Sequence, residues 1–140
     1  MSLRSPPVAR TESLVHPSAG GRGIIKQSEA EAFAATWIAD WNRRDLDAIL
    51  GHYTEDIRFH SPFARALIGD GLVVGRAALR AYWTEGLKRR PALRLELIDL
   101  FIGDSALALH FRDETGRRTV ETMIFDAQGK VMLSTGCYRS

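Results

Sequence analysis

The chain has 140 residues, of which 45% are hydrophobic and 26% charged, as is usual for one globular domain. No apolar run approaches the length of a membrane span, so we expect no membrane partner. The net charge of +2 arises within residues 1–23, which hold three arginines and one glutamate, and the rest of the chain is balanced. Because nucleic-acid-binding domains carry their basic surface on the folded part, we expect no nucleic-acid partner either.

Residues 1–23 are rich in Ser, Pro, Gly and Arg without hydrophobic periodicity, which predicts a flexible leader before one domain at 24–140. Cys137 is the only cysteine, so it has no partner for an internal disulfide and fits a reducing, cytoplasmic location. The histidines are scattered and lack zinc-ligand spacing, and no glycine-rich phosphate loop is present. We therefore expect neither a metal nor another cofactor.

Helices are predicted in the first part of the domain. Apolar residues at helical spacing predict an amphipathic helix over about 29–43, with Ser28 beginning a capping box. Asp45 is suited to cap a second, short helix. A third helix follows Gly75 and ends before Pro91.

Strands are predicted around and after these helices. A short strand ends at Ser61-Pro62, and a loop containing Gly69 and Gly71 follows it. Short turns separate four further segments that read as an antiparallel meander: 93–102, 105–113, 118–126 and 130–138. Helices followed by a meander predict an α+β fold with helices on one face of the sheet.

Several motifs then occur in a familiar order: the helix from Trp37 to Trp41, the segment 42–47, Ser61-Pro62, Gly75, and Phe125 followed by Gly129-Lys130-Val131. Over about 28–140 this order resembles the SnoaL-like group of the nuclear transport factor 2-like superfamily. The resemblance implies a cone-shaped, curved antiparallel sheet wrapped around three N-terminal helices, with an apolar pocket and often a homodimer. The superfamily includes ketosteroid isomerases, polyketide cyclases, dehydratases, epoxide hydrolases and proteins without chemistry, so the fold leaves function open.

Ketosteroid isomerases within this group offer a template for the site. Their catalytic aspartate directly precedes the proline that ends the first strand, where this chain has Ser61, which is no base near neutral pH. Their two pocket tyrosines correspond to Trp37 and Trp83. Their oxyanion-hole aspartate corresponds to Glu121. Steroid isomerisation by that mechanism is therefore not expected.

Glu121 is the candidate catalytic residue. If Phe125 faces the pocket, the two-residue period of a strand directs Met123 and Glu121 inward as well. A carboxyl in such apolar surroundings has a raised pKa and can act as a general acid or base. The alternative is a structural carboxyl that is hydrogen-bonded to a neighbouring element.

His110 is the second catalytic candidate. A two-residue turn at Thr115-Gly116 places His110 directly opposite Glu121, which predicts a metal-free acid–base dyad. A loop of three or five residues moves His110 to the other face. The two-residue register also directs outward an apolar set, which a homodimer would cover: Leu107, Leu109, Phe111, Val120, Thr122 and Ile124.

Aromatic residues supply most of the expected ligand pocket, although aromatic stripes of this kind also form ordinary cores. The expected ligand-binding residues are Trp37, Trp41, Ser61, Tyr82, Trp83, Met123, Phe125 and Tyr138. The main hypothesis is a cofactor-free isomerase, cyclase or dehydratase acting on an apolar, carbonyl-containing metabolite. The alternatives are a non-catalytic ligand-binding or accessory protein, and a protein-transport or assembly role through the sheet face.

Overall fold

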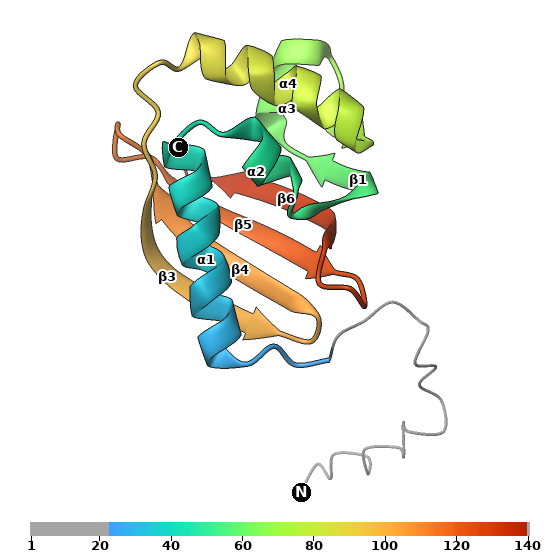
Figure 1. Cartoon of the computed structure of the whole chain (residues 1–140). Helices are drawn as coiled ribbons and strands as arrows, with labels where there is room; N and C mark the ends of the chain where they lie inside the picture. The colour runs from blue at the N-terminus through green and yellow to red at the C-terminus, as the bar shows by residue number, and fades with distance from the viewer. Residues whose placement is uncertain (1–22, 140) are drawn as a thin grey trace, which may run out of the picture.

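The computed structural model describes residues 23–139 and has an α+β fold (Figure 1). The predicted leader, apart from Gly23, lies outside the described residues. The helices within this range are α1 (Gln27–Asn42), α2 (Leu46–Leu50), α3 (Pro62–Ile68) and α4 (Arg76–Arg89). The strands are β1 (Tyr53–His60), β2 (Leu72–Val74), β3 (Glu96–Gly103), β4 (Ala106–Arg112), β5 (Arg118–Phe125) and β6 (Val131–Tyr138).

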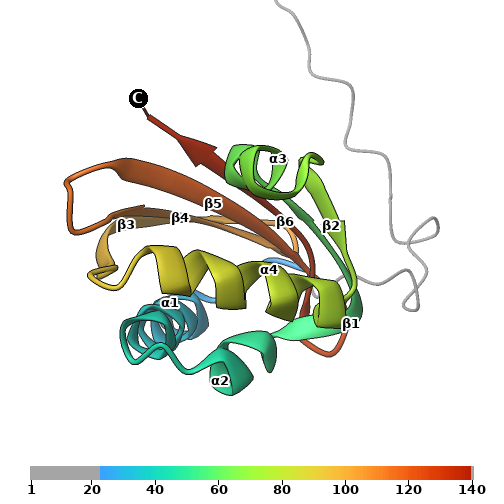
Figure 2. The ribbon, with the colours of Figure 1, turned by 90° about the horizontal axis from the view of Figure 1, so that it is seen from above.

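The strands form one curved, unclosed sheet in the order β2-β1-β6-β5-β4-β3. The predicted meander β3 to β6 is confirmed, and β1 joins it through a parallel pairing with β6. Helices α1 and α4 lie on the same side of the sheet, where α1 packs against β3 and α4 against β1 (Figure 2). The apolar core fills the space between these helices and the sheet.

The helix starts follow the sequence signals in part. Asp45 caps α2 as predicted, because its carboxylate accepts a hydrogen bond from the backbone N–H of Ala48 at 3.1 Å. Gly75 precedes α4 with a φ of 91°, as a glycine allows. The predicted capping box of α1 is wrong, because the helix begins at Gln27 and its N-cap is Lys26.

The segment after Ser61 is a helix, α3, where the sequence predicted a loop. The Ser61 hydroxyl accepts a hydrogen bond from the N–H of Phe63 at 3.2 Å, and Pro62 occupies the first helical position. Gly69, with a φ of 82°, ends the helix in the left-handed conformation. Serine, proline and glycine at these three places are helix signals, but the prediction took the proline only as the end of a strand.

The β4–β5 hairpin has a three-residue loop, Glu114 to Gly116, in place of the predicted two-residue turn. The N–H of Asp113 donates to the carbonyl of Arg117 at 2.9 Å. The Asp113 carboxylate accepts hydrogen bonds from the N–H groups of Thr115 and Arg117, and Gly116 has a φ of 87°. These interactions fix a loop with a left-handed residue at its end.

This loop reverses the predicted faces of β4. Leu109 lies opposite Glu121, and the next residue, His110, lies opposite Val120. Leu107, Leu109 and Phe111 are buried in the core, so the prediction that they face outward is wrong. On β5 the prediction was right: Val120, Thr122 and Ile124 share the face opposite to that of Glu121.

Two matched glycine substitutions test the loop. Gly116→Ala forces alanine into a left-handed conformation, so we expect the free energy of unfolding to fall by about 1–2 kcal/mol. Gly86→Ala lies inside α4 with no atom within 4 Å of the new methyl group, so we expect a gain of up to about 1 kcal/mol. Urea unfolding measures both, and a neutral Gly116→Ala would contradict the loop conformation.

Candidate functional site

Glu121 is a buried carboxyl on the inner face of β5, with 5% of its surface exposed. The hydroxyl of Ser134, on the adjacent β6, donates a short hydrogen bond to its Oε2 atom. Burial raises the pKa of Glu121 to about 7, and the Ser134 hydrogen bond opposes that rise. The residue therefore has the raised pKa that its position in the sequence predicted.

Gly136 makes room for this carboxyl. It lies opposite Glu121 in the β5–β6 pairing. A Cβ atom at Gly136 would lie 3.1 Å from Oε1 of Glu121 and 3.2 Å from the hydroxyl oxygen of Tyr138. The carboxyl and the phenol therefore share the space above a residue that has no side chain.

Ser61 connects two tyrosines at this site. Burial raises the pKa of Tyr138, the charge of Glu121 adds to the rise, and a hydrogen bond with Ser61 opposes it. Burial likewise raises the pKa of Tyr82, and a hydrogen bond with Ser61 again acts in the other direction. Ser61 thus caps α3 and also holds polar groups of the site, although it is not a base.

Trp37 and Tyr53 form a buried pair that lines the inner chamber together with Glu121. The indole Nε1–H of Trp37 donates to the hydroxyl oxygen of Tyr53 at 3.0 Å. Burial raises the pKa of Tyr53, the charge of Glu121 adds to this, and the Trp37 hydrogen bond opposes it. Because the phenol oxygen accepts from the indole, the tyrosine's own O–H can donate in another direction.

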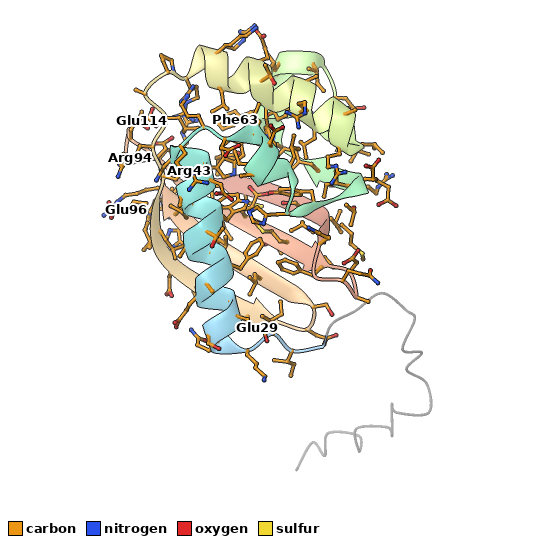
Figure 3. The ribbon with its side chains drawn as sticks, viewed as in Figure 1. Glu29, Arg43, Phe63, Arg94, Glu96 and Glu114 are labelled. Atoms are coloured by element: carbon orange, nitrogen blue, oxygen red, sulfur yellow. The ribbon has the colours of Figure 1, made fainter. Side chains whose placement is uncertain are left out.

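A two-chambered cavity leads to these groups. The inner chamber, of about 100 Å³, is lined by Glu121 and Tyr53, and the outer chamber, of about 510 Å³, lies among α3, α4 and the β4–β5 loop. The chambers adjoin, because Trp41 and Tyr138 line both. The outer volume is within the usual range for small-molecule sites. Figure 3 shows Phe63 and Glu114 at this end of the molecule and Glu29 at the opposite end.

Trp41 has an indole N–H without a partner. Its Nε1 atom has almost no solvent-accessible surface and no hydrogen-bond partner within residues 23–139. A buried N–H without a partner costs free energy. Trp41 lines both chambers, so its ring forms part of the cavity wall.

Most of the predicted site residues converge on this cavity. Trp37 and Glu121 line the inner chamber, and Tyr82 lines the outer chamber. Trp41, Trp83 and Tyr138 line both.

Four predicted residues line neither chamber. Ser61 is one of them, although it lies beside Tyr82 and Tyr138. Met123 and Phe125 are buried core residues outside both chambers, and the Phe125 ring packs against that of Phe33 at 5.1 Å. His110 lies on the outer sheet face opposite Val120. The predicted His110–Glu121 dyad is therefore wrong, because the three-residue loop shifts the register by one position.

Sequence reasoning missed other site residues. Ser134, Gly136 and Tyr138 alternate along β6, so the period of two could have found the first two once Tyr138 was placed inward. Tyr53 begins β1 and lines the inner chamber, but it was not among the predicted site residues. Arg90, which lines both chambers, follows α4 without any local pattern that indicates a site.

Within residues 23–139, no three His, Cys, Asp or Glu side chains are grouped so as to hold a metal ion. None of the helices in this range has the length and apolar character needed to cross a membrane.

A sheet with helices on one side and a cavity between them defines a class of small α+β proteins, the nuclear transport factor 2-like and cystatin-like folds. The family model of the SnoaL-like domain matches residues 34–131. The chain therefore belongs to the SnoaL-like family. None of the curated proteins matches the chain.

The solved structures that are similar to this chain have the same class of fold. A SnoaL-like protein of unknown function from Burkholderia thailandensis is 34% identical, with a TM-score of 0.81 over 84% of this chain and 99% of that one. AclR from Streptomyces galilaeus, a candidate hydroxylase, is 25% identical, with a TM-score of 0.63 over 81% and 91%. SalBIII, an epoxide hydrolase/cyclase-like enzyme of pyran ring formation in salinomycin, is 18% identical, with a TM-score of 0.64 over 81% and 93%.

The raised pKa of Glu121 makes stability depend on pH. Folding raises this pKa from 4.5 to about 7, so the stabilisation by the bound proton is complete below pH 4.5 and is lost as the pH rises through 7. Relative to Glu121→Gln, the free energy of unfolding of the wild type should fall by about 3 kcal/mol between pH 4.5 and 8. Urea unfolding across this range measures the difference. Glu55→Gln, at an exposed position, is the control, and parallel pH profiles of wild type and Glu121→Gln would contradict the assignment.

Proposed function

We propose that the chain binds a small, largely apolar metabolite with a carbonyl group and transfers a proton on it, as a cofactor-free isomerase, cyclase or dehydratase. The observation that carries the proposal is the buried Glu121 carboxyl lining the inner end of an aromatic cavity. Burial that raises its pKa to about 7 keeps both the acid and the base form populated near neutral pH.

The donors around Glu121 suit a carbonyl oxygen. The phenols of Tyr53 and Tyr138 lie near the carboxyl. In the proposed step, the Glu121 carboxylate takes a proton from the carbon next to the carbonyl, and negative charge develops on the carbonyl oxygen. Donors fixed at that oxygen stabilise the charge. The protonated Glu121 then returns the proton to another atom of the ligand.

The family supports this class of chemistry without naming a reaction. One structural neighbour is described as epoxide hydrolase/cyclase-like and another as a candidate hydroxylase. Those descriptions apply to those proteins, and unrelated chemistries share this kind of fold.

The second candidate is a ligand-binding or accessory protein without chemistry. The observation that favours it is the hydrogen bond from Ser134, which occupies one oxygen of Glu121. If this bond fixes the carboxyl for structural reasons alone, the cavity binds a ligand and Glu121 takes no part in a reaction.

Exchange of ligand protons distinguishes the two candidates. A ligand retained on protein from its own cells, identified by native mass spectrometry, is incubated with enzyme in D₂O. We expect deuterium at the carbon next to its carbonyl, at a rate that Glu121→Gln lowers by about 10²–10⁴-fold while ligand binding persists.

Trp41→Phe is the matched control, because it changes the wall shared by the chambers, keeps an aromatic ring and leaves Glu121 in place. We expect it to weaken binding of this ligand through the loss of apolar surface, while deuterium exchange into the bound ligand persists. Binding without any wild-type exchange would support the accessory role and contradict the proton transfer.

A homodimer through the outer sheet face is also part of the proposal. Because Leu107, Leu109 and Phe111 lie in the core, the apolar character of the outer face depends on other residues. Phe101, which is 58% exposed, and Val120, which is 37% exposed, are among them. A second copy would cover them. The cytoplasmic location expected from the single cysteine likewise stays a proposal.

Sedimentation velocity at micromolar concentration tests the dimer. We expect a dimer for the wild type and a monomer for Val120→Glu combined with Phe101→Glu, because buried unpaired carboxylates oppose association. Ile68→Glu, at an exposed position of α3, should leave the dimer intact. A monomeric wild type would contradict the proposed interface.

A further inference from the structure

The outer chamber has three arginines in its wall, and two of them are engaged. Arg90 donates to the carboxylates of Asp113 and Glu114 at 3.0 Å, and Arg89 lies 3.4 Å from Glu85. Arg117 has no ion pair within residues 23–139. Arg117 is therefore the arginine of the chamber wall that no carboxylate within residues 23–139 engages in an ion pair.

The two carboxylates near Arg117 belong to Asp113 and Glu114, and both accept hydrogen bonds from groups of the protein. Asp113 accepts hydrogen bonds from Thr115, Arg117 and Arg90, and Glu114 accepts from Arg90 and from the N–H of Arg94. Their charges are thus engaged by donors of the protein.

Phe63 holds the side chain of Arg117 over the entrance. The guanidinium carbon lies 5.3 Å from the centre of the Phe63 ring, and that ring packs against Tyr138 at 4.3 Å. Contact with an aromatic face leaves the N–H groups at the edge of the planar guanidinium available to an anion. The next residue, Arg118, belongs to the other face of the sheet, where it lies opposite Arg112.

We infer that the ligand of this cavity carries an anionic group, a carboxylate, sulfonate or phosphate, which Arg117 binds at the entrance while the apolar body fills the chambers. This inference rests on the proposed function, because it names the class of ligand for the same cavity. Arg117 and Glu121 are four residues apart along one strand direction, which corresponds to about 13 Å. The ligand is therefore an amphipathic acid with its anionic group on the order of 10 Å from the carbonyl.

Two fluorescent probes that differ by one anionic group test the inference. 8-Anilino-1-naphthalenesulfonate carries a sulfonate, and N-phenyl-1-naphthylamine has the same ring system without it. We expect Arg117→Gln to weaken binding of the sulfonate probe about fivefold and to leave binding of the neutral probe unchanged. The control Arg118→Gln should change neither by more than about twofold, and the Arg117 effect should shrink in 1 M NaCl.

Gly86→Trp shows whether the probes occupy the cavity. Gly86 lines the outer chamber and has open space beside its Cα, so an indole there fills the chamber and should abolish binding of both probes. Ala66→Trp, on the other wall, serves the same purpose if Gly86→Trp does not fold.

If both probes bind in the cavity and Arg117→Gln affects them equally, the inference fails and the proposed function stands. If neither probe binds, or if both blocking variants leave binding unchanged, the proposed cavity fails and the inference with it.

Discussion

The loop between β4 and β5 determines which residues of those strands face the interior. The Asp113 carboxylate accepts hydrogen bonds from the backbone N–H groups of Thr115 and Arg117, and Gly116 takes a left-handed conformation. These interactions fix a loop of three residues. Because side chains alternate along a strand, that length places Leu109 beside Glu121 and sends His110 to the outer face. The loop consequently places buried apolar side chains of β4 beside the Glu121 carboxyl.

The chemical character of the site comes from the contrast between its two ends. At the inner end, an apolar environment raises the pKa of Glu121, and Ser134 provides a hydrogen bond that opposes the rise. At the entrance, the Arg117 guanidinium lies over the Phe63 ring without an ion pair within residues 23–139. Aromatic rings between these ends offer surface for the apolar body of the proposed ligand.

The sequence predicted the fold class, the meander and the inward carboxyl, because these depend on hydrophobic periodicity and on the order of the elements. It failed where a local signal has two interpretations. Ser61 and Pro62 end a strand and also begin α3, and a glycine after a polar residue suits loops of two or three residues. Arg90 and Tyr53 reach the cavity through tertiary packing, which leaves no local pattern.

The most direct test is the titration of Glu121 itself, by ¹³C NMR of labelled glutamate side-chain carboxyls. We expect one carboxyl resonance that titrates near pH 7 and is missing from the Glu121→Gln spectrum. If the resonance lost in Glu121→Gln titrates instead near the ordinary glutamate value of about 4.3, the carboxyl is well solvated or paired with a cation. That result would contradict the buried acid–base group on which the proposed function depends.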